Sequence, residues 1–437
     1  MSRIDASHDP GLHSWVDSAN AVGTDFPIQN LPFAAFSRDG EETRIGVGIG
    51  DRILDVAALA PHLEGAARAA AHACGQPVLN PLMILGAPAR RELRLALSHA
   101  LAARACEPAS WVKSALYPQS EVRLHLPVRI GGFTDFFASI DHAANAGSLF
   151  RPEAPLLPNY RHLPVAYNGR ANSVRCEPDV ARPHGQIRNE GDDLPVYLPS
   201  RRLDYEVELG GYVGTASRRG RPVPVGEAWE HFFGFSLLND WSARDIQAWE
   251  YQPLGPFLAK SFATSVSPWV VTAEALAPYR GPARPRGEQA PALLPHLHDA
   301  GDQEAGALDI TLELHLRSAR MEQEGLPPVV LSRGNTATLY WTFAQMLAHH
   351  TSNGSSLDAG DLLGSGTVSG AGSDSWGSLL EITRGGTETV RLPTGETRGF
   401  LADGDEIIIT GHCERPGLAR IGFGQCHGRI VAAGAQA

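Results

Sequence analysis

Two acidic residues on one predicted strand are the first candidates for chemistry. The segment from Leu203 to Leu209 alternates apolar and acidic residues, which is typical of a strand with one packed face and one face of carboxylates. Glu206 and Glu208 then point the same way. A solvated strand face gives the same pattern, but neighbouring like charges repel, and a hard divalent cation removes that repulsion by accepting several oxygen ligands. Further carboxylates at the same place would favour a metal site.

The segment 239–251 supplies a second polar group. Asn239 or Asp240 can cap a short helix that stops before Pro253. An N-cap followed by an ordinary polar face is one interpretation, whereas two tryptophans within nine residues indicate a helix packed into the protein. On such a helix one stripe, at positions i, i+4, i+7 and i+11, would contain Asp240, Arg244, Gln247 and Tyr251.

The passage that follows Pro253 and the segment around Asp135 contribute further groups. Lys260 and Thr264 lie in a predicted rigid, non-helical passage that can present a cation near the same place. Asp135 is a possible helix cap seven positions before His142, so the two would share a helical face. A lone histidine is more often structural than functional.

Two downstream segments complete the candidate set. The loop 364–370 is rich in glycine and hydroxyl groups and can bring backbone N–H groups and Thr367 close to a carboxylate, although a flexible turn has the same composition. Glu381 lies in the apolar run 379–382, and an acid in that setting usually has a partner such as a histidine.

The elements that must position these residues are mainly strands. The 46 glycines and 32 prolines, with long alternating segments, favour a β-rich and turn-rich fold. At 437 residues the chain should form two domains. We expect a polar leader over 1–24, a small β domain over 25–121 and a larger catalytic domain over 122–437. In the small domain, a hairpin is predicted over 44–59 and helices over 62–74 and 86–104.

Composition excludes several classes of partner. The net charge of −11 comes from 48 acidic and 37 basic residues without a run of either sign, which disfavours nucleic acid and anionic lipid. No stretch approaches the ~18 apolar residues of a membrane helix, and the N-terminus has no signal-peptide pattern. Five scattered cysteines indicate reduced thiols. We therefore expect a cytoplasmic protein with no membrane partner.

Several motifs together resemble the fumarylacetoacetate hydrolase family. They occur in order from about residue 25 to about residue 430 and read DFPIQNLP, TDFFASIDHAANAG, HLPVAYNGRANSV, LDYEVELGGYVG, NDWSARDIQAWEYQPLGPFLAKSFATSVSPWVV, SGTVSG and GFGQC. The resemblance implies an α+β, predominantly β fold, with a small N-terminal SH3-like barrel followed by a C-terminal mixed β-sandwich roll. It also implies a homodimer.

Position by position, the resemblance implies a Mg²⁺ or Ca²⁺ ion as cofactor. Its ligands would be Asp135, Glu206, Glu208 and Asp240, with Lys260 and Thr264 beside the metal. Carboxylates without cysteine or neutral histidine suit a hard cation on physical grounds as well. His142 matches the general base, Glu381 matches its orienting partner, and developing oxyanion charge would be stabilised by Arg244, Gln247 and Lys260.

The substrate contacts implied by the resemblance are Phe137, Arg151, Tyr167, Gln247, Tyr251 and Thr367. One position departs from the family, which commonly has a tyrosine where this chain has Phe137. The missing hydroxyl removes one hydrogen bond and bears on the exact substrate, but it affects neither the metal ligands nor the base.

The implied reaction is hydrolysis of the carbon–carbon bond of fumarylacetoacetate, a small acidic diketone, to fumarate and acetoacetate. This is the last step of tyrosine and phenylalanine breakdown through homogentisate. Two alternatives stay open. One is a related acylpyruvate hydrolase or keto-acid decarboxylase or isomerase, and the other is a catalytically silent scaffold. The joint presence of His142, Glu381 and four metal carboxylates argues against the scaffold.

Overall fold

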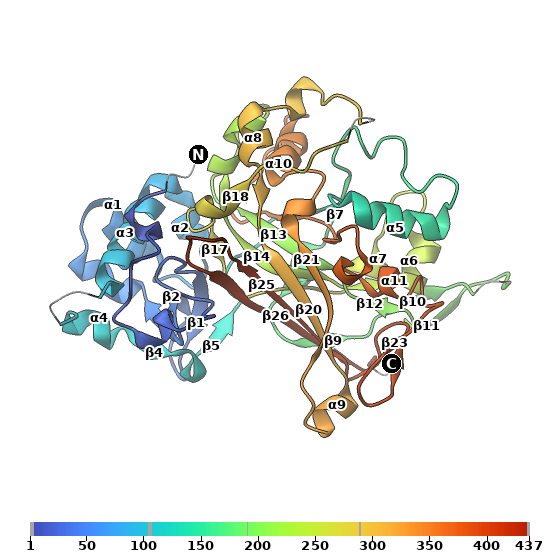
Figure 1. The fold of residues 1–437 in the computed structure, drawn as a ribbon, viewed down its shortest axis with the longest axis horizontal. Helices are drawn as coiled ribbons and strands as arrows, with labels where there is room; N and C mark the ends of the chain where they lie inside the picture. Colours follow the sequence, from blue (N-terminus) through green and yellow to red (C-terminus); the bar gives the residue numbers. More distant parts are fainter. Residues whose placement is uncertain (1–3, 104–106, 190, 288–289, 435–437) are drawn as a thin grey trace.

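A computed structural model describes residues 4–103, 107–189, 191–287 and 290–434. The fold is mixed α+β and mostly β. A smaller N-terminal part, blue in Figure 1, packs beside a larger part that holds the remaining sheets. Among the described residues, no helix is long and apolar enough to cross a membrane. The four described cysteines, Cys74, Cys176, Cys413 and Cys426, are free thiols, and Cys106 lies outside the described residues.

The N-terminal part is built on a five-stranded antiparallel sheet in the order β4-β3-β2-β1-β5. The strands are β1 (Phe33–Ser37), β2 (Arg44–Ile49), β3 (Arg52–Asp55), β4 (Leu116–Pro118) and β5 (Arg123–His125). Strands β2 and β3 confirm the predicted hairpin, which turns at Gly50 with a φ of 55°. Helices α1 (Gly65–Ala73) and α3 (Gly86–Leu101) confirm the two helical segments.

The larger part contains an eight-stranded sheet in the order β7-β6-β22-β13-β14-β16-β8, with β17 paired to β14. Its strands are β6 (Phe133–Phe136), β7 (Ala166–Asn168), β8 (Val174–Arg175), β13 (Val207–Val213), β14 (Phe232–Asp240), β16 (Thr264–Val266), β17 (Val271–Thr272) and β22 (Leu362–Gly364). All nine residues of β14 are buried, as expected for a central strand that is covered on both faces.

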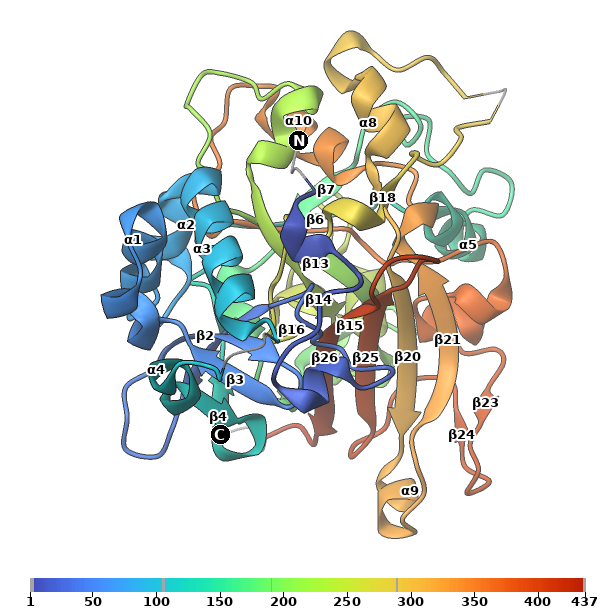
Figure 2. The same cartoon turned by 60° about the vertical axis from the view of Figure 1, so that its left-hand side comes forward.

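A five-stranded sheet in the order β21-β20-β25-β26-β9 packs against the eight-stranded one, and Figure 2 shows its long strands. Its strands are β9 (Asp179–Ala181), β20 (Thr311–Arg317), β21 (Val329–Asn335), β25 (Glu406–Cys413) and β26 (Ile421–Val431). In β20 buried and half-buried residues alternate, so one face packs inward. The shared core includes Leu237 of β14, Leu312 of β20 and Ile409 of β25.

Shorter elements connect these sheets. The short strands are β10 (His184–Ile187), β11 (Val196–Pro199), β12 (Leu203–Asp204), β15 (Ser242–Ala243), β18 (Arg280–Gly281), β19 (Ala307–Leu308), β23 (Val390–Arg391) and β24 (Thr397–Arg398). The remaining α-helices are α2 (Asn80–Ile84), α4 (Ser110–Ser114), α5 (Ile140–Phe150), α6 (Arg244–Glu250), α7 (Leu258–Ser261), α8 (Ala300–Ala305), α9 (Ala319–Gln323), α10 (Phe343–Thr351) and α11 (Leu379–Ile382).

The structure corrects the predicted local setting of two metal candidates. Asp135 does not cap a helix but lies in strand β6, and Ser139 is the residue that caps α5 by accepting a hydrogen bond from the backbone N–H of His142. Asp240 is the last residue of β14 and not the first residue of a helix, so it does not share a stripe with Arg244. In both cases pairing with neighbouring strands outweighs local capping preference.

Two further expectations on local structure were wrong. The predicted continuous strand 203–209 is interrupted, because β12 pairs with β15 whereas β13 pairs with β14, which leaves Glu206 between them. Lys260 lies in the short helix α7 and not in a non-helical passage. Even so, the four predicted metal ligands lie together in the structure, with Lys260 and Thr264 beside them.

Candidate metal centre and adjoining polar network

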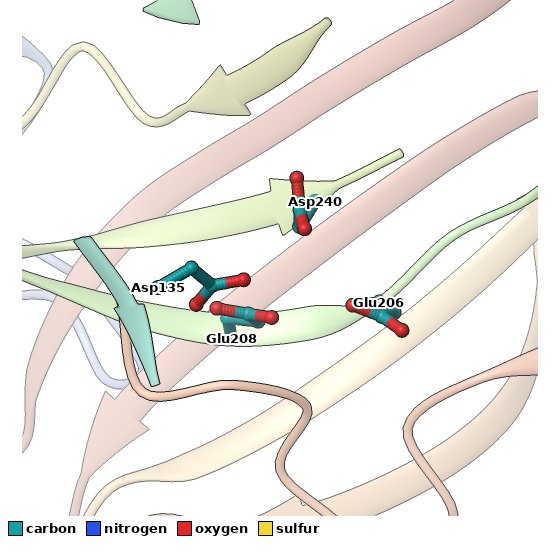
Figure 3. A group of neighbouring side chains, drawn as sticks. All are labelled: Asp135, Glu206, Glu208 and Asp240. Carbon is teal, nitrogen blue, oxygen red and sulfur yellow. The ribbon is translucent and has the colours of Figure 1, made fainter. Parts of the chain in front are cut away.

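Four buried carboxylates converge at the edge where strands β6, β13 and β14 end or begin. One oxygen from each of the four lies within 4.8 Å of the others, and the group consists of Asp135, Glu206, Glu208 and Asp240. Figure 3 shows Asp135, Glu208 and Asp240 extending from strands β6, β13 and β14 and Glu206 from the segment before β13. The prediction that these four residues come together is therefore confirmed.

Strand β22 lies between β6 and β13 and leaves room for these side chains because it ends in glycine. Gly364 pairs with Asp135 on one side, and Gly210 is its partner on the other. A Cβ at Gly364 would lie 2.4 Å from Asp135 Oδ1 and 3.1 Å from Glu208 Oε2. Any larger residue at this position would push the two carboxylates apart.

The glycine-rich loop after β22 supplies a backbone donor to the cluster. The Gly366 N–H donates to Glu208 Oε2 at 3.1 Å and to Asp135 Oδ1 at 3.3 Å. Gly366 has a φ of 71°, which L side chains rarely adopt. This confirms that the loop brings a backbone N–H to carboxylates. Thr367 is buried, and its Oγ1 has no hydrogen-bond partner among the described residues.

Cationic and hydroxyl groups surround one side of the cluster. The Lys260 ammonium contacts Glu206 and lies 2.8 Å from Asp240 Oδ2. The Tyr167 hydroxyl donates to Asp240 Oδ2 at 2.6 Å, and the Thr264 hydroxyl donates to Asp240 Oδ1 at 3.2 Å. Lys260 and Thr264 therefore lie beside the carboxylate cluster, where they were expected.

Arg244 adds a second cation at Glu206. Its Nη2 atom lies 2.8 Å from Glu206 Oε1, and its Nη1 donates to Gln247 Oε1 at 3.1 Å. Arg244 is buried and Gln247 is half-buried. Both residues lie on α6, so their spacing of three positions places them on one side of the helix.

The electrostatic environment differs among the four carboxylates. Burial and the neighbouring carboxylates raise the pKa of Asp135 and of Glu208 well above the usual range. Burial also acts to raise the pKa of Glu206, but the adjacent Lys260 and Arg244 outweigh it and hold that pKa below its usual range. Asp135 and Glu208 therefore have less compensating positive charge beside them than Glu206 has.

These residues fit a hard divalent cation. Among the described residues, no lysine or arginine forms an ion pair with Asp135 or Glu208, and Glu208 Oε1 is buried without a hydrogen-bond partner. Four oxygen donors at this separation, with no cysteine or histidine among them, suit Mg²⁺ or Ca²⁺ better than Zn²⁺ or Cu²⁺. The cluster can therefore hold a metal ion.

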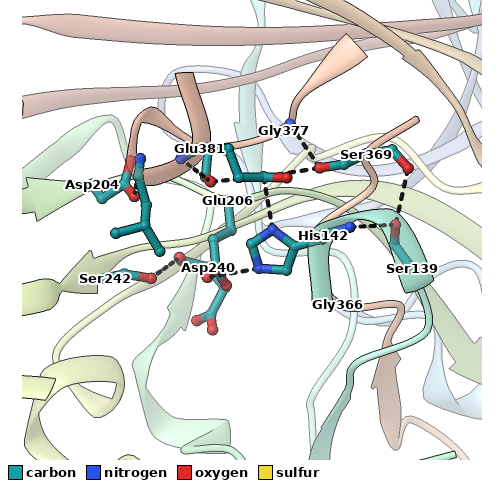
Figure 4. A network of polar contacts seen from close by, with 12 residues as sticks. Ser139, His142, Asp204, Glu206, Asp240, Ser242, Gly366, Ser369, Gly377 and Glu381 are labelled. Atoms are coloured by element: carbon teal, nitrogen blue, oxygen red, sulfur yellow. Dashed lines mark hydrogen bonds and ion pairs between the residues drawn. The ribbon is translucent and has the colours of Figure 1, made fainter. Parts of the chain in front are cut away.

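A buried histidine–glutamate pair adjoins the cluster (Figure 4). His142 Nδ1 lies 2.7 Å from Glu381 Oε2, and His142 Nε2 lies 3.9 Å from Glu206 Oε1. Burial acts to raise the pKa of Glu381, but His142 and the hydroxyl and amide donors around the carboxylate lower it below its usual value. A carboxylate on Nδ1 leaves Nε2 directed at the metal candidates.

Sequence reasoning missed the residues that hold Glu381 in place. Its Oε2 accepts hydrogen bonds from the hydroxyls of Ser369 at 2.9 Å and Ser378 at 2.8 Å, and its Oε1 accepts one from Asn145 Nδ2 at 2.9 Å. Asn145 lies three positions after His142 on α5, a helical spacing that gives a usable signal. Ser378 caps α11 three positions before Glu381, which is a second signal.

The predicted substrate residues divide into two groups. The Phe137 ring lies edge-on to the His142 ring, with 5.3 Å between centroids, so it borders the histidine, and its predicted contact with substrate stays a prediction. Tyr251 is exposed, and its hydroxyl accepts a hydrogen bond from the Gln252 amide. Arg151 donates to the backbone carbonyl of Pro155 at 3.2 Å. For Arg151 and Tyr251 the structure therefore records local contacts and none to the carboxylate cluster.

A cavity of about 230 Å³ reaches the cluster from outside. The residues that line it include Tyr167, Asp240, Phe257, Lys260 and Thr264. A small molecule in this cavity would meet the same groups that surround Asp240.

Known proteins share both parts of the chain. The sequence model described as fumarylacetoacetase N-terminal matches residues 29–127, and the one described as fumarylacetoacetate hydrolase C-terminal matches residues 132–431. Among solved structures, the fumarylacetoacetate hydrolase of psychrophilic Exiguobacterium antarcticum is 18% identical with a TM-score of 0.46, over 92% of this chain and 99% of that one.

Curated relatives are much more similar in sequence. The fumarylacetoacetase of Homo sapiens is 45% identical over 94% of this chain and 98% of the relative, and that of Arabidopsis thaliana is 43% identical over 96% and 98%. The fumarylacetoacetase of Caenorhabditis elegans is 45% identical over 94% of this chain and 97% of the relative. With both family models matched and this identity over nearly its whole length, the chain belongs to the fumarylacetoacetate hydrolase family.

Proposed function

We propose that the protein hydrolyses the carbon–carbon bond of fumarylacetoacetate to fumarate and acetoacetate, the last step of tyrosine and phenylalanine breakdown. The observation that carries this proposal is the four-carboxylate cluster with the His142–Glu381 pair directly beside it. The identity of 42 to 45% to fumarylacetoacetases of animals, plants and Dictyostelium discoideum supports the same substrate.

In this proposal Mg²⁺ or Ca²⁺ is held by Asp135, Glu206, Glu208 and Asp240. When bound, such an ion polarises a substrate carbonyl and stabilises the enolate that leaves when the carbon–carbon bond breaks. Lys260 and Thr264 fix the Asp240 carboxylate through Oδ2 and Oδ1 respectively, so both of its oxygens are oriented before the ion arrives. The Gly366 N–H does the same for Glu208 and Asp135.

His142 acts as the general base. Its Nδ1–H donates to Glu381, which leaves Nε2 as the acceptor for a proton from water. The water oxygen bonds to the ketone carbon that will become the carboxyl carbon of fumarate. The carbon–carbon bond then breaks, its electron pair forms the enolate of acetoacetate, and a proton at carbon completes the product.

Arg244, Lys260 and Gln247 supply donors for oxyanion charge that develops on the attacked carbonyl. Positioned cations and amides in a buried site stabilise such charge more than they would in water. Phe137, Tyr167 and Thr367 border the reacting end of the substrate. Arg151 and Tyr251 bind its outer end, since a guanidinium fork suits a carboxylate.

A hydrolysis assay of the purified chain tests the function. We expect fumarylacetoacetate to be consumed, activity to be lost after treatment with a chelator, and activity to return on addition of Mg²⁺ or Ca²⁺. Full activity in the metal-stripped protein would refute the metal-dependent mechanism. Comparing kcat/KM for fumarylacetoacetate with that for acylpyruvates separates the proposal from a related hydrolase, and faster acylpyruvate hydrolysis would replace the proposed substrate.

Phe137→Tyr tests the position at which the chain departs from its family. We expect the KM for fumarylacetoacetate to fall by a few-fold, because the ring already borders His142 and a neutral hydrogen bond contributes about 0.5–1.5 kcal/mol net. If the bond forms only in the transition state, kcat rises instead, and steady-state kinetics separate the two cases. A loss of more than about tenfold in kcat/KM, near 1.4 kcal/mol, would show that the pocket requires an apolar contact there.

We further propose a cytoplasmic homodimer. Free cysteines, three of them buried, suit a reducing compartment. Exposed apolar side chains on the β10–β11 hairpin, at the end of α6 and in the loop after it support a subunit contact. They are Leu194, Val196, Tyr197, Trp249, Leu254 and Phe257. Trp249 bonds to Gln186 of β10, which links the helix to the hairpin.

The finer description of the fold is part of the proposal. It assigns 1–24 to a leader, 25–121 to an SH3-like barrel and 122–437 to a mixed β-sandwich roll that carries the catalytic site. The five-stranded sheet β4-β3-β2-β1-β5 supports a separate small N-terminal unit, and its edge strand β5 (Arg123–His125) extends this unit a few residues past 121.

A further inference from the structure

A fifth carboxylate, Asp204, lies beside the metal candidates without belonging to their group. Its side chain is fully buried, with 0% exposure. Strand β12 fixes its backbone, because Asp204 pairs with Ser242 of β15 directly before helix α6. A buried carboxylate is costly unless cations or N–H groups compensate it. Its partners therefore indicate what it is for.

One set of partners is the Arg244 guanidinium. Both Nε and Nη2 of Arg244 lie 2.9 Å from Asp204 Oδ2. The same Nη2 lies 2.8 Å from Glu206 Oε1, and Nη1 is free to donate to Gln247. Asp204 thus sets the orientation and the position of the Arg244 guanidinium beside Glu206.

The other partners are backbone N–H groups of α11. The Leu379 N–H donates to Asp204 Oδ1 at 2.8 Å, and the Leu380 N–H donates to Asp204 Oδ2 at 3.0 Å. The next residue in the chain is Glu381, which binds His142 Nδ1. Asp204 therefore also fixes the segment that leads directly into the histidine's partner, and Figure 4 shows it near this segment.

We propose that Asp204 is a positioning residue that sets the separation between Arg244 and the Glu381–His142 pair. Asp204 orients Arg244, which would stabilise oxyanion charge. It also positions Glu381, which would orient the base His142. Because small misplacements of such groups cost rate and leave binding largely intact, Asp204 acts on turnover without touching the substrate. The inference rests on the proposed function.

Asp204→Asn is the first test, because it keeps the size of the side chain and turns an N–H toward Arg244. We expect kcat for fumarylacetoacetate to fall by about 10–100-fold, the range typical of residues that orient ligands or bases, with KM and Mg²⁺ affinity each changed less than about threefold. A change confined to KM, to metal affinity or to thermal stability would overturn the proposal.

Asp405→Asn is the matched control. Asp405 is also fully buried, binds Arg398 through both carboxylate oxygens at 2.7 and 2.9 Å, and accepts the Ala402 N–H at 2.9 Å. It has the same kinds of partner as Asp204 but none from the site. We expect a comparable fall in melting temperature and a kcat within about twofold of wild type. An equal loss of kcat in both variants would make the Asp204 effect structural and overturn the proposal.

Double-mutant cycles locate the effect. In the Arg244→Gln background and in the Glu381→Gln background, Asp204→Asn should cost less kcat than in wild type, because each background removes a group through which Asp204 acts. Full multiplicative effects in both backgrounds would overturn the proposal.

If Asp204→Asn does not fold, Asp204→Glu keeps the charge but displaces it by one methylene. A wild-type kcat in Asp204→Glu would overturn the proposal, and a tenfold loss would support it. An inactive wild-type protein refutes the proposed function, whereas an active wild type with an active Asp204→Asn refutes this inference alone.

Discussion

His142→Asn should abolish most turnover while leaving metal binding intact. General base catalysis by a positioned side chain typically contributes about 10²–10⁴-fold, so we expect kcat to fall by that factor. His142 is buried, with Nδ1 bound to Glu381 and Nε2 3.9 Å from Glu206, so an asparagine fits the space but has no basic nitrogen to accept a proton from water. Steady-state assay with fumarylacetoacetate measures the loss.

Calorimetric titration with Mg²⁺ on the same variant separates chemistry from binding. Because His142 is outside the group of four carboxylates, the Mg²⁺ affinity of His142→Asn should stay within about threefold of wild type. His231→Asn is the matched control, because His231 is half-buried and its Nδ1 donates to the Thr215 carbonyl at 2.7 Å, away from the four carboxylates. A kcat in His142→Asn within tenfold of wild type would remove the histidine from the role of base.

Asp240→Ala or Glu208→Ala should abolish both metal binding and turnover. Partners that merely orient metal ligands cost about 10–100-fold in affinity when mutated, so loss of a direct ligand should cost at least the upper end of that range. Without the bound ion, the remaining carboxylates stay buried together and no metal charge offsets their mutual repulsion. Titration with Mg²⁺ and with Ca²⁺ measures the affinity, and circular dichroism checks that the protein remains folded.

Glu274→Ala is the control for removal of a buried carboxylate. Glu274 is buried and lies 3.2 Å from Arg90 Nη2, and it is not a member of the four-carboxylate group. We expect unchanged metal affinity in this variant with a loss of stability of about 3–5 kcal/mol, because the truncation leaves the Arg90 charge buried without its partner. Unchanged Mg²⁺ and Ca²⁺ affinity in either Asp240→Ala or Glu208→Ala would refute the ligand assignment.

The sequence by itself indicated most of the residues that make up the site. Glu206 and Glu208 are two positions apart, a spacing that directs both side chains to one side of an extended segment whether or not the strand is continuous. The hairpin at 44–59 and the helices at 62–74 and 86–104 also follow from local pattern alone, because turn glycine and alanine-rich composition act over a few residues. Local information therefore sufficed where the cause was local.

The tertiary structure decided how these residues are arranged in space. Capping preference predicts Asp135 and Asp240 at helix starts, yet both lie in strands, because pairing of β6 with β22 and of β14 with β16 outweighs a single cap. The first pairing joins segments more than two hundred residues apart, and the second joins segments more than twenty residues apart, so the spacing within either segment does not encode it. Arg151 and Tyr251 are predicted to contact the substrate. In the structure they contact Pro155 and Gln252, so their role at the substrate stays a prediction.

Asp204 shows the same limit most directly. In sequence it is one more acid in an alternating run, two positions before Glu206. Only the fold brings Arg244 and the backbone of Leu379 and Leu380 to its two oxygens. A residue that acts through partners from distant segments has no pattern of its own, because its role is defined by contacts that form when the sheets and α11 pack together.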